Sequence, residues 1–541
     1  MKSIIVAIVS LTTLTGCAFA QDAVFTTFKY EGHDARFEKA CDTASEYLNP
    51  ILAGFYPDPS ICRKGDTYYL VNSSFSFFPG VPIFESRDLV NWTQIGHVLD
   101  RQSQLPLEGQ WVSGGIYAPA ISYNPSNDTF YMVTTNVGAG GNFFVKTKDP
   151  HKGWSDPIYL PEVNGIDPSF LFDDDGKAYL VHNSEVMGTA SYDGERAIRL
   201  FEFSVENDCT VGEPLEIVRG GTHVEKNPIW IEGPHLYHIG NYYYLMCAEG
   251  GTGDRHSEVI FRAPRPQGPW EECPRNPILT QRTGLDPARA DIVTSTGHAD
   301  IIQAPDGSWW GVFLGCRPYE GDLYNTGRET FLLPVSWEDG WPVILEAGKA
   351  VPTVVKKEGL AHQDGLLTGN FSYTDKLTEP GFRWVYLRTP MEDKVKFTRH
   401  GLSLTPHSAV FCRQQHTSFT AETRLEYRAE QEGGLAGMVL FQNEQYNLVF
   451  GKTLLGGKPA VVLERTEGAK ALIGSHALKH NDKPLRLKVE GDGRYYSFYY
   501  AEGDAGRWHL LSENVDCSNL STNRAGGFIG TMIGLCATGG E

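Results

Sequence analysis

Three short motifs in this sequence place an acidic residue directly before a proline or one position earlier. They are Pro57-Asp58-Pro59, Ile166-Asp167-Pro168 and Glu232-Gly233-Pro234. Carboxyl groups that meet in one basin repel one another, so at least one pKa rises. A protonated carboxyl group beside an ionised one is what general acid and base catalysis requires. Each motif alone is also an ordinary turn signal, so the predicted chemistry depends on what brings the three together.

A five-fold repeat is the element that positions these side chains. Each unit has a tight turn followed by an aromatic or apolar strand, and an earlier strand precedes the turn. The turn-and-strand segments are residues 65–71, 127–133, 175–181, 240–246 and 306–312. The earlier strands carry Asp58, Ala118, Asp167, Glu232 and His298, which we align as equivalent positions facing one centre. This pattern predicts a five-bladed β-propeller over residues 45–355.

The remaining segments also favour an all-β protein. After three of the units, residues 86–92, 148–154 and 262–270 each end in a tryptophan, and we interpret them as outer strands. From residue 365 to residue 541, many short strands with polar turns predict a second domain, a β-sandwich. Residues 352–363 are the predicted linker.

Charge and the first residues restrict partners and location. The net charge of -19 repels phosphate backbones, so nucleic acid is excluded as a partner, whereas a neutral polysaccharide is not affected. Residues 1–20 are typical of a signal peptide, with a short apolar stretch after Lys2. Two cleavage sites stay open, one before Gln21 and one at a lipobox that would leave Cys17 lipidated. Both predict export, as a periplasmic, extracellular or lipid-anchored outer-membrane protein.

At this point the sequence resembles glycoside hydrolase family 43. The resemblance extends over nearly all of the mature chain and rests on these motifs: Gly54-Phe55-Tyr56-Pro57-Asp58-Pro59-Ser60-Ile61, Gly165-Ile166-Asp167-Pro168-Ser169, Glu232-Gly233-Pro234-His235-Leu236-Tyr237 and Gly327-Arg328-Glu329-Thr330-Phe331. Residues 384–390 look like the start of that family's β-xylosidase-type C-terminal domain, a concanavalin-like jelly roll.

The resemblance implies an inverting mechanism. Asp58 matches the general base that activates water, and Glu232 matches the general acid that protonates the leaving oxygen. Asp167 matches the carboxylate that adjusts the pKa of the acid. Base and acid are then expected to lie roughly 6.5–9.5 Å apart, with room for the water. Arg328 matches an arginine that contacts substrate hydroxyl groups; a surface ion pair is its alternative.

The resemblance also implies further substrate contacts. Phe75, Phe77 and Phe78 are candidate platforms for a sugar ring, with core packing as the alternative. Some β-xylosidases of the family carry tryptophan where Phe77 stands, which leaves the exact sugar open. His298 matches a histidine near the axis that in some relatives lies by a calcium ion or water; a calcium site here would need most of its ligands from water. No cofactor is required. The glycine-rich strand at residues 526–534 resembles a segment that closes one end of the cleft.

Three hypotheses for the function follow. The first is exo-acting release of terminal pentose from xylan-derived oligosaccharides by a β-1,4-xylosidase, with α-L-arabinofuranosidase activity as an alternative or second activity. The second is a non-catalytic carbohydrate-binding propeller, which the fold permits. The third, an interaction propeller of the WD type, needs shorter and more even repeats. The sequence does not specify the linkage or the oligomeric state.

Overall fold

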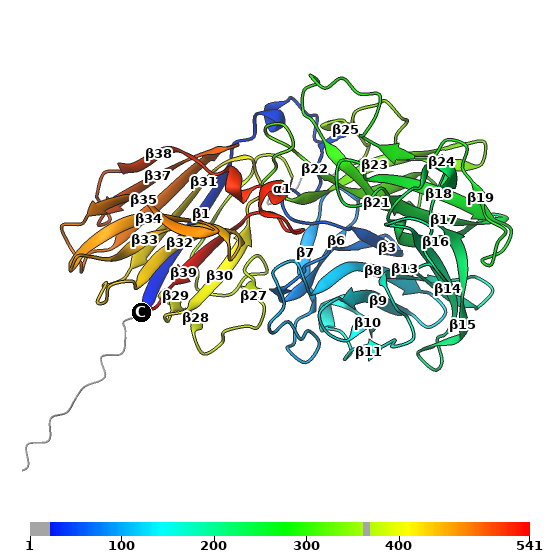
Figure 1. Ribbon diagram of the computed structural model, residues 1–541, viewed down its shortest axis with the longest axis horizontal. Helices are drawn as coiled ribbons and strands as arrows, with labels where there is room; N and C mark the ends of the chain where they lie inside the picture. Colours follow the sequence, from blue (N-terminus) through cyan, green and yellow to red (C-terminus); the bar gives the residue numbers. More distant parts are fainter. Residues whose placement is uncertain (1–21, 361–367, 541) are drawn as a thin grey trace, which may run out of the picture.

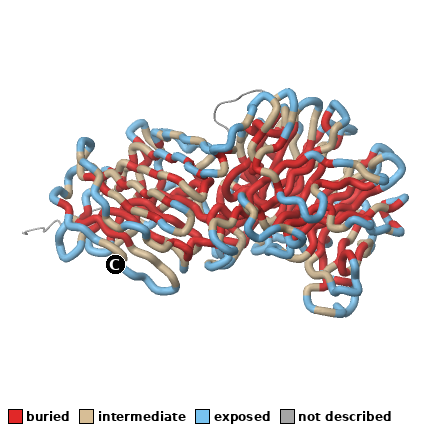
Figure 2. The backbone as a smooth tube through the Cα atoms, turned by 90° about the horizontal axis from the view of Figure 1, so that it is seen from above, coloured by how far each residue is buried: buried red, intermediate tan, exposed pale blue. Residues whose placement is uncertain are grey.

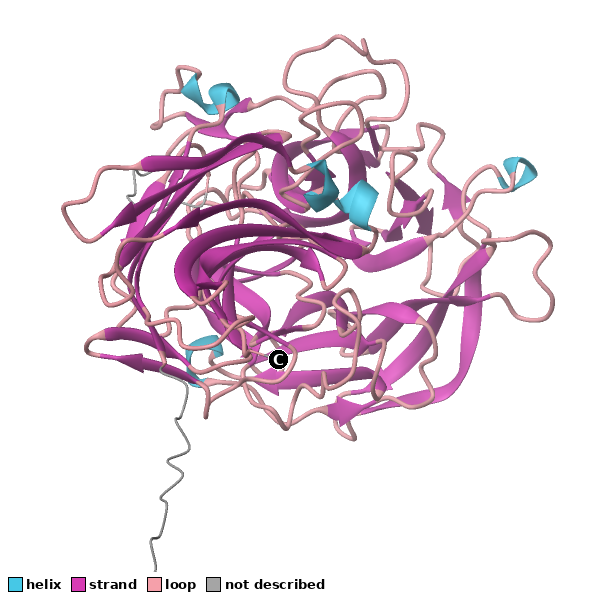
Figure 3. Cartoon of the chain, turned by 60° about the vertical axis from the view of Figure 1, so that its left-hand side comes forward, coloured by secondary structure: helices cyan, strands magenta, loops and turns pink. Residues whose placement is uncertain are grey.

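The first part of the chain folds into five antiparallel sheets that follow one another in sequence. The computed structural model describes residues 22–360 and 368–540. Almost all of its regular structure is β-strand (Figure 3). The first sheet contains β3 (Ser60–Lys64), β4 (Thr67–Val71), β6 (Gly80–Ser86) and β7 (Thr93–Leu99). The second contains β8 (Ile116–Asn124), β9 (Thr129–Asn136), β10 (Gly141–Thr147) and β11 (Ile158–Tyr159).

The next three sheets repeat this order. The third contains β12 (Ile166–Phe172), β13 (Ala178–Glu185), β14 (Arg196–Ser204) and β15 (Cys209–Arg219). The fourth contains β16 (Glu232–Ile239), β17 (Tyr242–Glu249), β18 (Ser257–Ala263) and β19 (Glu271–Glu272), with β20 (Leu279–Thr280) also on β18. The fifth contains β21 (Thr294–Gln303), β22 (Trp309–Cys316), β23 (Arg328–Glu338) and β24 (Trp341–Val343).

The first strands of the five sheets pack side by side around a common centre. The contacts run from β3 to β8, β12, β16 and β21, and β21 returns to β3. Each predicted tight turn joins the first and second strands of its sheet, so the five predicted hairpins are confirmed. This arrangement places the entrances of five strands around one axis, at the right of Figure 1.

The predicted outer strands at residues 86–92, 148–154 and 262–270 are wrong. The third strands of these sheets already end at Ser86, Thr147 and Ala263, and the segments are the connections to the fourth strands. In the first, the Asp88 carboxylate accepts hydrogen bonds from the backbone N–H groups of Val90 and Asn91. A side chain that satisfies the backbone in this way favours a turn over a strand.

The second domain is a sandwich of two large antiparallel sheets, at the left of Figure 1. One sheet contains β1 (Ala23–Gly32), β26 (Ser372–Asp375), β28 (Val395–Thr398), β29 (Gly401–Leu404), β31 (Ser418–Glu426), β36 (Leu485–Asp492), β37 (Tyr495–Glu502) and β38 (His509–Asp516). The other contains β30 (Ser408–Arg413), β32 (Leu435–Asn443), β33 (Tyr446–Leu455), β34 (Lys458–Glu467), β35 (Ala469–Ala477) and β39 (Met532–Ala537). Buried backbone runs through the centre of both domains (Figure 2).

The sandwich takes its strand β1 from the N-terminal segment, which the sequence analysis left unassigned. β1 pairs with β29, β31 and β26. Its buried Phe25, Phe28 and Tyr30 belong to the core of the sandwich. The described chain therefore passes from the sandwich into the five sheets and back, so the two domains are joined at both ends of the five-sheet segment.

The short elements complete the description. Two small sheets pair β2 (Glu46–Leu48) with β25 (Val354–Lys356) and β5 (Phe77–Phe78) with β27 (Tyr386–Leu387). The helices are η1 (Ala35–Glu38), η2 (Pro150–Lys152), η3 (Val224–Lys226), η4 (Ser518–Leu520) and α1 (Thr522–Ala525). In the described part of the chain, no helix is long and apolar enough to cross a membrane.

Some sequence-based boundaries lie outside the described residues. These are the signal peptide at 1–20 with its lipobox at Cys17, the end of the predicted linker and the first residues of the predicted sandwich at 365. All nine cysteines of the described part are free thiols.

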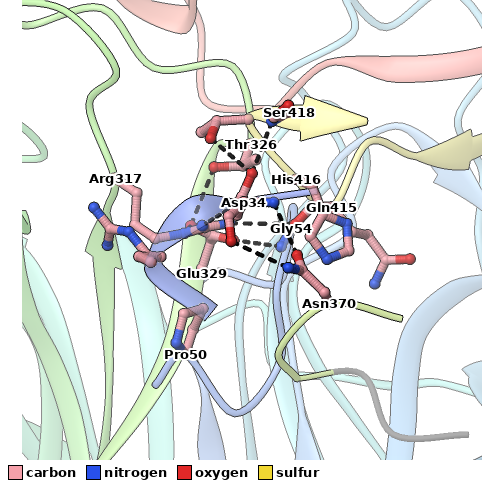
Figure 4. A network of polar contacts seen from close by, with 12 residues as sticks. Asp34, Pro50, Gly54, Arg317, Thr326, Glu329, Asn370, Gln415, His416 and Ser418 are labelled. Carbon is pink, nitrogen blue, oxygen red and sulfur yellow. Dashed lines mark hydrogen bonds and ion pairs between the residues drawn. The ribbon is translucent and has the colours of Figure 1, made fainter. Parts of the chain in front are cut away.

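The two domains meet through a buried ionic network (Figure 4). Arg317, at the end of β22, donates to Asp34 over 2.5 Å and to Glu329 of β23 over 2.8 Å. Asp34 follows β1 and also accepts from the Ser418 backbone N–H, over 2.7 Å. Glu329 accepts from the Gly54 backbone N–H over 2.6 Å. The network therefore joins the sandwich to the residues that flank Asp58 and Arg328.

Candidate active site

A backbone feature repeated in each sheet aims one side chain at the centre. In or just before each first strand, a residue of the repeated motif has the left-handed backbone conformation. These residues are Asp58 (φ 51°), Ala118 (φ 37°), Asp167 (φ 56°), Gly233 (φ 55°) and His298 (φ 49°). In four of the sheets, the register between the first two strands shifts at this point. Such bulges re-aim side chains and are common next to active sites.

This geometry corrects the sequence alignment of the fourth unit. Gly233, not Glu232, occupies the position equivalent to Asp58 and Asp167, and Glu232 stands one residue earlier. A Cβ atom on Gly233 would lie 2.9 Å from the His298 ring, so a larger residue does not fit. The Gly233 backbone N–H donates to the Asp167 carboxylate over 3.0 Å. Gly233 is thus a site residue that the sequence analysis missed.

The aimed side chains line one pocket with a volume of about 730 Å³. It contains Asp58, Asp167, Glu232, His298 and Arg328, so the structure brings the predicted carboxylates, histidine and arginine together. The three carboxylates are nearly fully buried, with exposed fractions of 5% for Asp58, 6% for Asp167 and 8% for Glu232. Buried carboxyl groups without full pairing are rare outside functional sites.

Asp58 is held in its ionised form by three neighbours. Its carboxylate accepts from Arg328 over 2.7 Å and from the Ser73 hydroxyl over 2.6 Å. The His298 Nδ1 atom lies 3.8 Å away. Burial raises the pKa of Asp58, but Arg328, His298 and Ser73 outweigh burial, and the net pKa is below its usual value. Asp58 is therefore a carboxylate that can accept a proton near neutral pH.

The pKa values of Asp167 and Glu232 are shifted upward, in the opposite direction to that of Asp58. Burial, and then the negative charge of Asp58, raise the pKa of Asp167. Burial, and then the charges of Asp167 and Asp58, raise the pKa of Glu232 well above that of an ordinary glutamate. Among the described residues, no group donates a hydrogen bond to the Glu232 carboxyl. Glu232 is therefore the group that keeps a proton and can deliver it to a substrate.

His298 lies beside Asp58 as a neutral ring. Burial lowers the pKa of His298 to about 4, although the charge of Asp58 opposes this shift. No cluster of three or more His, Cys, Asp or Glu side chains suited to a metal ion occurs in the described part of the chain. A calcium ion beside His298 stays a prediction, and such an ion would take its other ligands from water or backbone.

An aromatic wall faces the carboxylates. Phe75 stacks on Phe528 with ring centroids 5.9 Å apart, and Tyr117 meets both rings edge-on. The Arg328 guanidinium lies 5.7 Å from the Phe75 centroid and 5.8 Å from that of Phe528. Phe528 comes from the sandwich, so the second domain contributes directly to the pocket. Its segment was predicted as a strand from residue 526, but the strand β39 begins only at Met532.

Phe78 was predicted with Phe77 as a sugar platform, but it packs in a hydrophobic cluster and does not line this pocket. Phe77 does not reach the pocket either, and its prediction as a sugar platform is wrong. Its side chain is 1% exposed and packs edge-on against Phe55 and Phe411. The backbone explains the difference, because Phe77 belongs to β5, which pairs with β27 of the second domain. Phe77 therefore stabilises the contact between the domains, which was its alternative interpretation.

The pocket also has a lining that the sequence motifs did not indicate. These residues include Asn164, Asn183, Glu185, Arg196, Trp230 and Thr252. Asn183, Glu185 and Arg196 belong to β13 and β14 of the third sheet. Asn164, Trp230 and Thr252 lie in the connections before β12, before β16 and after β17. They lie outside the repeated motif, so nothing in the spacing could have assigned them to the pocket.

Sequence profiles of known families match both domains. The profile of the glycosyl hydrolases family 43 matches residues 47–342, which is more than half of the chain. The chain belongs to glycosyl hydrolase family 43. The profile of the beta xylosidase C-terminal concanavalin A-like domain matches residues 376–541. The predicted family and the type of the second domain are both confirmed.

Family 43 relatives match over nearly their whole length. A xylosidase/arabinosidase of Butyrivibrio fibrisolvens is 38% identical over 519 residues, covering 91% of this chain and 95% of that protein. The non-reducing end alpha-L-arabinofuranosidase BoGH43B of Bacteroides ovatus is 35% identical, with 91% of each chain covered. A GH43_12 crystal structure from a capybara gut metagenome has a TM-score of 0.88 at 44% identity, covering 96% of this chain and 100% of that one.

Family 43 membership gives the pocket its general chemistry. The protein is a glycoside hydrolase, an enzyme that cleaves glycosidic bonds. Hydrolysis of this kind uses two carboxyl groups, one protonated and one ionised. The pocket supplies both states, with Asp58 on the ionised side and Glu232 on the protonated side.

Proposed function

We propose that the enzyme is an inverting exo-glycosidase that releases terminal pentose from xylan-derived oligosaccharides, as a β-1,4-xylosidase. Asp58 is the general base, Glu232 the general acid and Asp167 the carboxylate that raises the pKa of the acid. The observation that carries the proposal is the opposite pKa shift of Asp58 and Glu232 within one buried pocket.

The proposed reaction is a single displacement. Asp58 takes a proton from a water molecule, whose oxygen bonds to the anomeric carbon. The bond between that carbon and the glycosidic oxygen breaks, and Glu232 gives its proton to the departing oxygen. Arg328 keeps Asp58 ionised before the attack. The products are a free pentose of inverted configuration and a shortened oligosaccharide.

Two further features support the proposal. Phe528 and its loop close one side of the pocket, which favours binding of a chain end over the interior of a chain. The ring of five first strands supports a five-bladed propeller as the scaffold, because a propeller directs one strand of each blade to its axis.

α-L-Arabinofuranosidase activity is the second candidate, alone or beside the first. It is favoured by the names of two relatives, a xylosidase/arabinosidase and a non-reducing end alpha-L-arabinofuranosidase.

Export from the cytoplasm is part of the proposal, and mass spectrometry of the mature N-terminus would distinguish cleavage before Gln21 from lipidation of Cys17. No cofactor takes part.

Hydrolysis of p-nitrophenyl β-D-xylopyranoside and p-nitrophenyl α-L-arabinofuranoside tests the proposal. We expect the wild type to cleave at least the xyloside, with inversion visible by NMR of the released sugar. Glu232→Gln and Asp58→Asn should each lose roughly 10²–10⁴-fold in kcat on xylobiose. Glu232→Gln should lose less on a xylosyl fluoride, because fluoride leaves without a proton.

Matched controls are buried carboxyl groups outside the pocket. Glu249→Gln controls for Glu232, and Asp173→Asn controls for Asp58, and both should keep nearly full activity. Retention of anomeric configuration would contradict the single displacement. Binding of xylo- or arabino-oligosaccharides without hydrolysis would favour the carbohydrate-binding hypothesis.

A further inference from the structure

Trp230 and Arg196 form a pair in the pocket that the proposed mechanism does not use. Trp230 stands two residues before Glu232, and Arg196 begins β14 of the neighbouring sheet. Both line the pocket. The Arg196 guanidinium lies over the indole, 4.3 Å from the ring centroid.

The backbone of Trp230 is strained. Its φ of 53° is in the left-handed region, which a bulky residue rarely adopts. The backbone around it is fixed, since the Trp230 N–H donates to Gly194 over 2.9 Å and the Ile229 carbonyl accepts from Gly250 over 2.9 Å. Strain of this kind persists where the surrounding structure imposes it, and it concentrates at ligand sites.

Trp230 and Arg196 are also incompletely satisfied by the protein. Trp230 is only partly buried and belongs to none of the hydrophobic clusters found in the described residues. Arg196 donates from Nη1 to Glu185 over 3.2 Å. Its Nε atom is buried and has no acceptor among the described groups. The Arg196 side chain is 23% exposed, so its guanidinium can also reach a ligand in the pocket. A partly exposed indole beside an accessible guanidinium is a suitable site for a sugar ring and its hydroxyl groups.

The position of the pair relative to Glu232 indicates which sugar it would bind. The general acid must lie next to the glycosidic oxygen, so the group that departs with that oxygen lies on the Glu232 side. Phe75, Phe528, Arg328 and Asp58 form a separate set of contacts around the base. The cavity of about 730 Å³ has room for more than one pentose ring.

We propose that Trp230 and Arg196 bind the leaving-group saccharide, with its ring against the indole and a hydroxyl group accepting from the solvent-accessible part of the Arg196 guanidinium. The ligand is the second sugar residue of a pentose oligosaccharide, so the inference rests on the proposed function. The pair then determines the preference for oligosaccharides over glycosides with small leaving groups.

The test compares substrates with and without a sugar as leaving group. β-1,4-xylobiose and α-1,5-arabinobiose carry one, and the corresponding glycosyl fluorides do not. In Trp230→Ala and Arg196→Ala we expect kcat/KM to fall by about tenfold to a hundredfold more on the disaccharide than on the fluoride. Assays at about pH 5 keep Glu232 protonated in every variant, because its raised pKa lies above that pH.

A matched pair in the sandwich provides the control. The Arg486 guanidinium lies 4.7 Å from the ring centroid of Trp508, outside the pocket. Trp508→Ala and Arg486→Ala should leave both rates unchanged. Equal losses on disaccharide and fluoride, or no loss on the disaccharide, would overturn the proposal.

Binding separates this inference from the proposed function. Calorimetry with xylobiose and arabinobiose, using Glu232→Gln with and without Trp230→Ala, measures the subsite without turnover. Weaker binding of the double variant supports the subsite even if the wild type hydrolyses neither disaccharide. If Glu232→Gln binds each disaccharide equally well with and without Trp230→Ala, the subsite is contradicted, even if the wild type proves to be an active glycosidase.

Discussion

At the scale of single residues, the pocket separates two carboxyl groups by giving them different neighbours. Asp58 has a cation, a hydroxyl donor and a histidine within reach, whereas Glu232 faces two negative charges and no donor among the described groups. Burial is the largest cause of the raised pKa of Glu232, and the charge of Asp167 is the second largest. A single substitution at Asp167 removes that charge.

Asp167→Asn should therefore lower the pKa of Glu232 and reduce kcat. Glu232 must be protonated to act, so activity is lost as pH rises through its pKa. With the charge of Asp167 removed, we expect this alkaline limb of the kcat/KM profile to move to lower pH. The acidic limb, set by protonation of Asp58, should move little.

The profile of Asp173→Asn provides the comparison. Asp173 is a buried carboxylate that accepts from Tyr243 and His238, outside the pocket. In Asp173→Asn, both limbs of the profile of kcat/KM against pH should stay where they are in the wild type. An alkaline limb that stays in place in Asp167→Asn would show that Asp167 does not control the acid.

At the scale of elements, a loop of the sandwich completes a pocket built by the other domain. The Phe528 backbone N–H donates to the Ser113 hydroxyl over 2.9 Å, and the Thr531 N–H donates to the Asn325 carbonyl over 2.8 Å. The backbone of Gly530 lies so close to Thr326 that a Cβ atom would come within 2.7 Å of it. These contacts fix the loop beside Arg328.

Phe528→Ala should weaken substrate binding without unfolding the protein. The ring is only partly buried and stacks on Phe75, so its removal opens the pocket and takes away an apolar surface. We expect kcat/KM for the xyloside to fall about tenfold, mainly through a higher KM.

The matched control is Phe382→Ala, since Phe382 is a 50% exposed phenylalanine of the second domain that does not line the pocket. It should behave as the wild type. If Phe528→Ala keeps the wild-type KM, the loop does not contact the substrate.

The same elements show what the sequence could predict. The five hairpins and the entrances at Asp58, Asp167 and His298 were predictable, because turn residues and aromatic strands repeat locally. The offset of Glu232 was not, because Gly233 takes the left-handed position only through the bulge. Trp230 lacks any repeated spacing, so only the folded chain assigns it to the pocket.

At the scale of the whole molecule, the two domains act as one unit. Besides Phe528, an apolar cluster joins them, in which Phe55 and Phe77 of the propeller segment pack with Phe411 and Ile529 of the sandwich. β1 was missed because its partner strands lie hundreds of residues away, and because a bulge between Phe25 and Thr27 interrupts the alternation of its buried Phe25, Phe28 and Tyr30.

The network of Asp34, Arg317 and Glu329 should contribute to the free energy of unfolding, because it connects the two domains. Burial raises the pKa of Asp34, but Arg317, His416 and the Ser418 backbone N–H together outweigh burial, and the net pKa is below its usual value. Removal of Asp34 leaves Arg317 paired with Glu329 alone, and the buried Arg317 Nη1 group loses its acceptor. Asp34→Ala should therefore lower the free energy of unfolding by about 2 kcal/mol, measured by urea denaturation.

The decisive quantity is the coupling between the two partners. In a double-mutant cycle of Asp34→Ala and Arg317→Ala, the double variant should be less unstable than the sum of the single variants. Because Glu329 adjoins Arg328 and accepts from Gly54, the Arg317→Ala variant should also lose kcat on the xyloside. Asp339→Ala removes an exposed ion pair with Arg275 and should change neither quantity. Additive losses without a change in kcat would mean that the network holds the domains together but does not position the site.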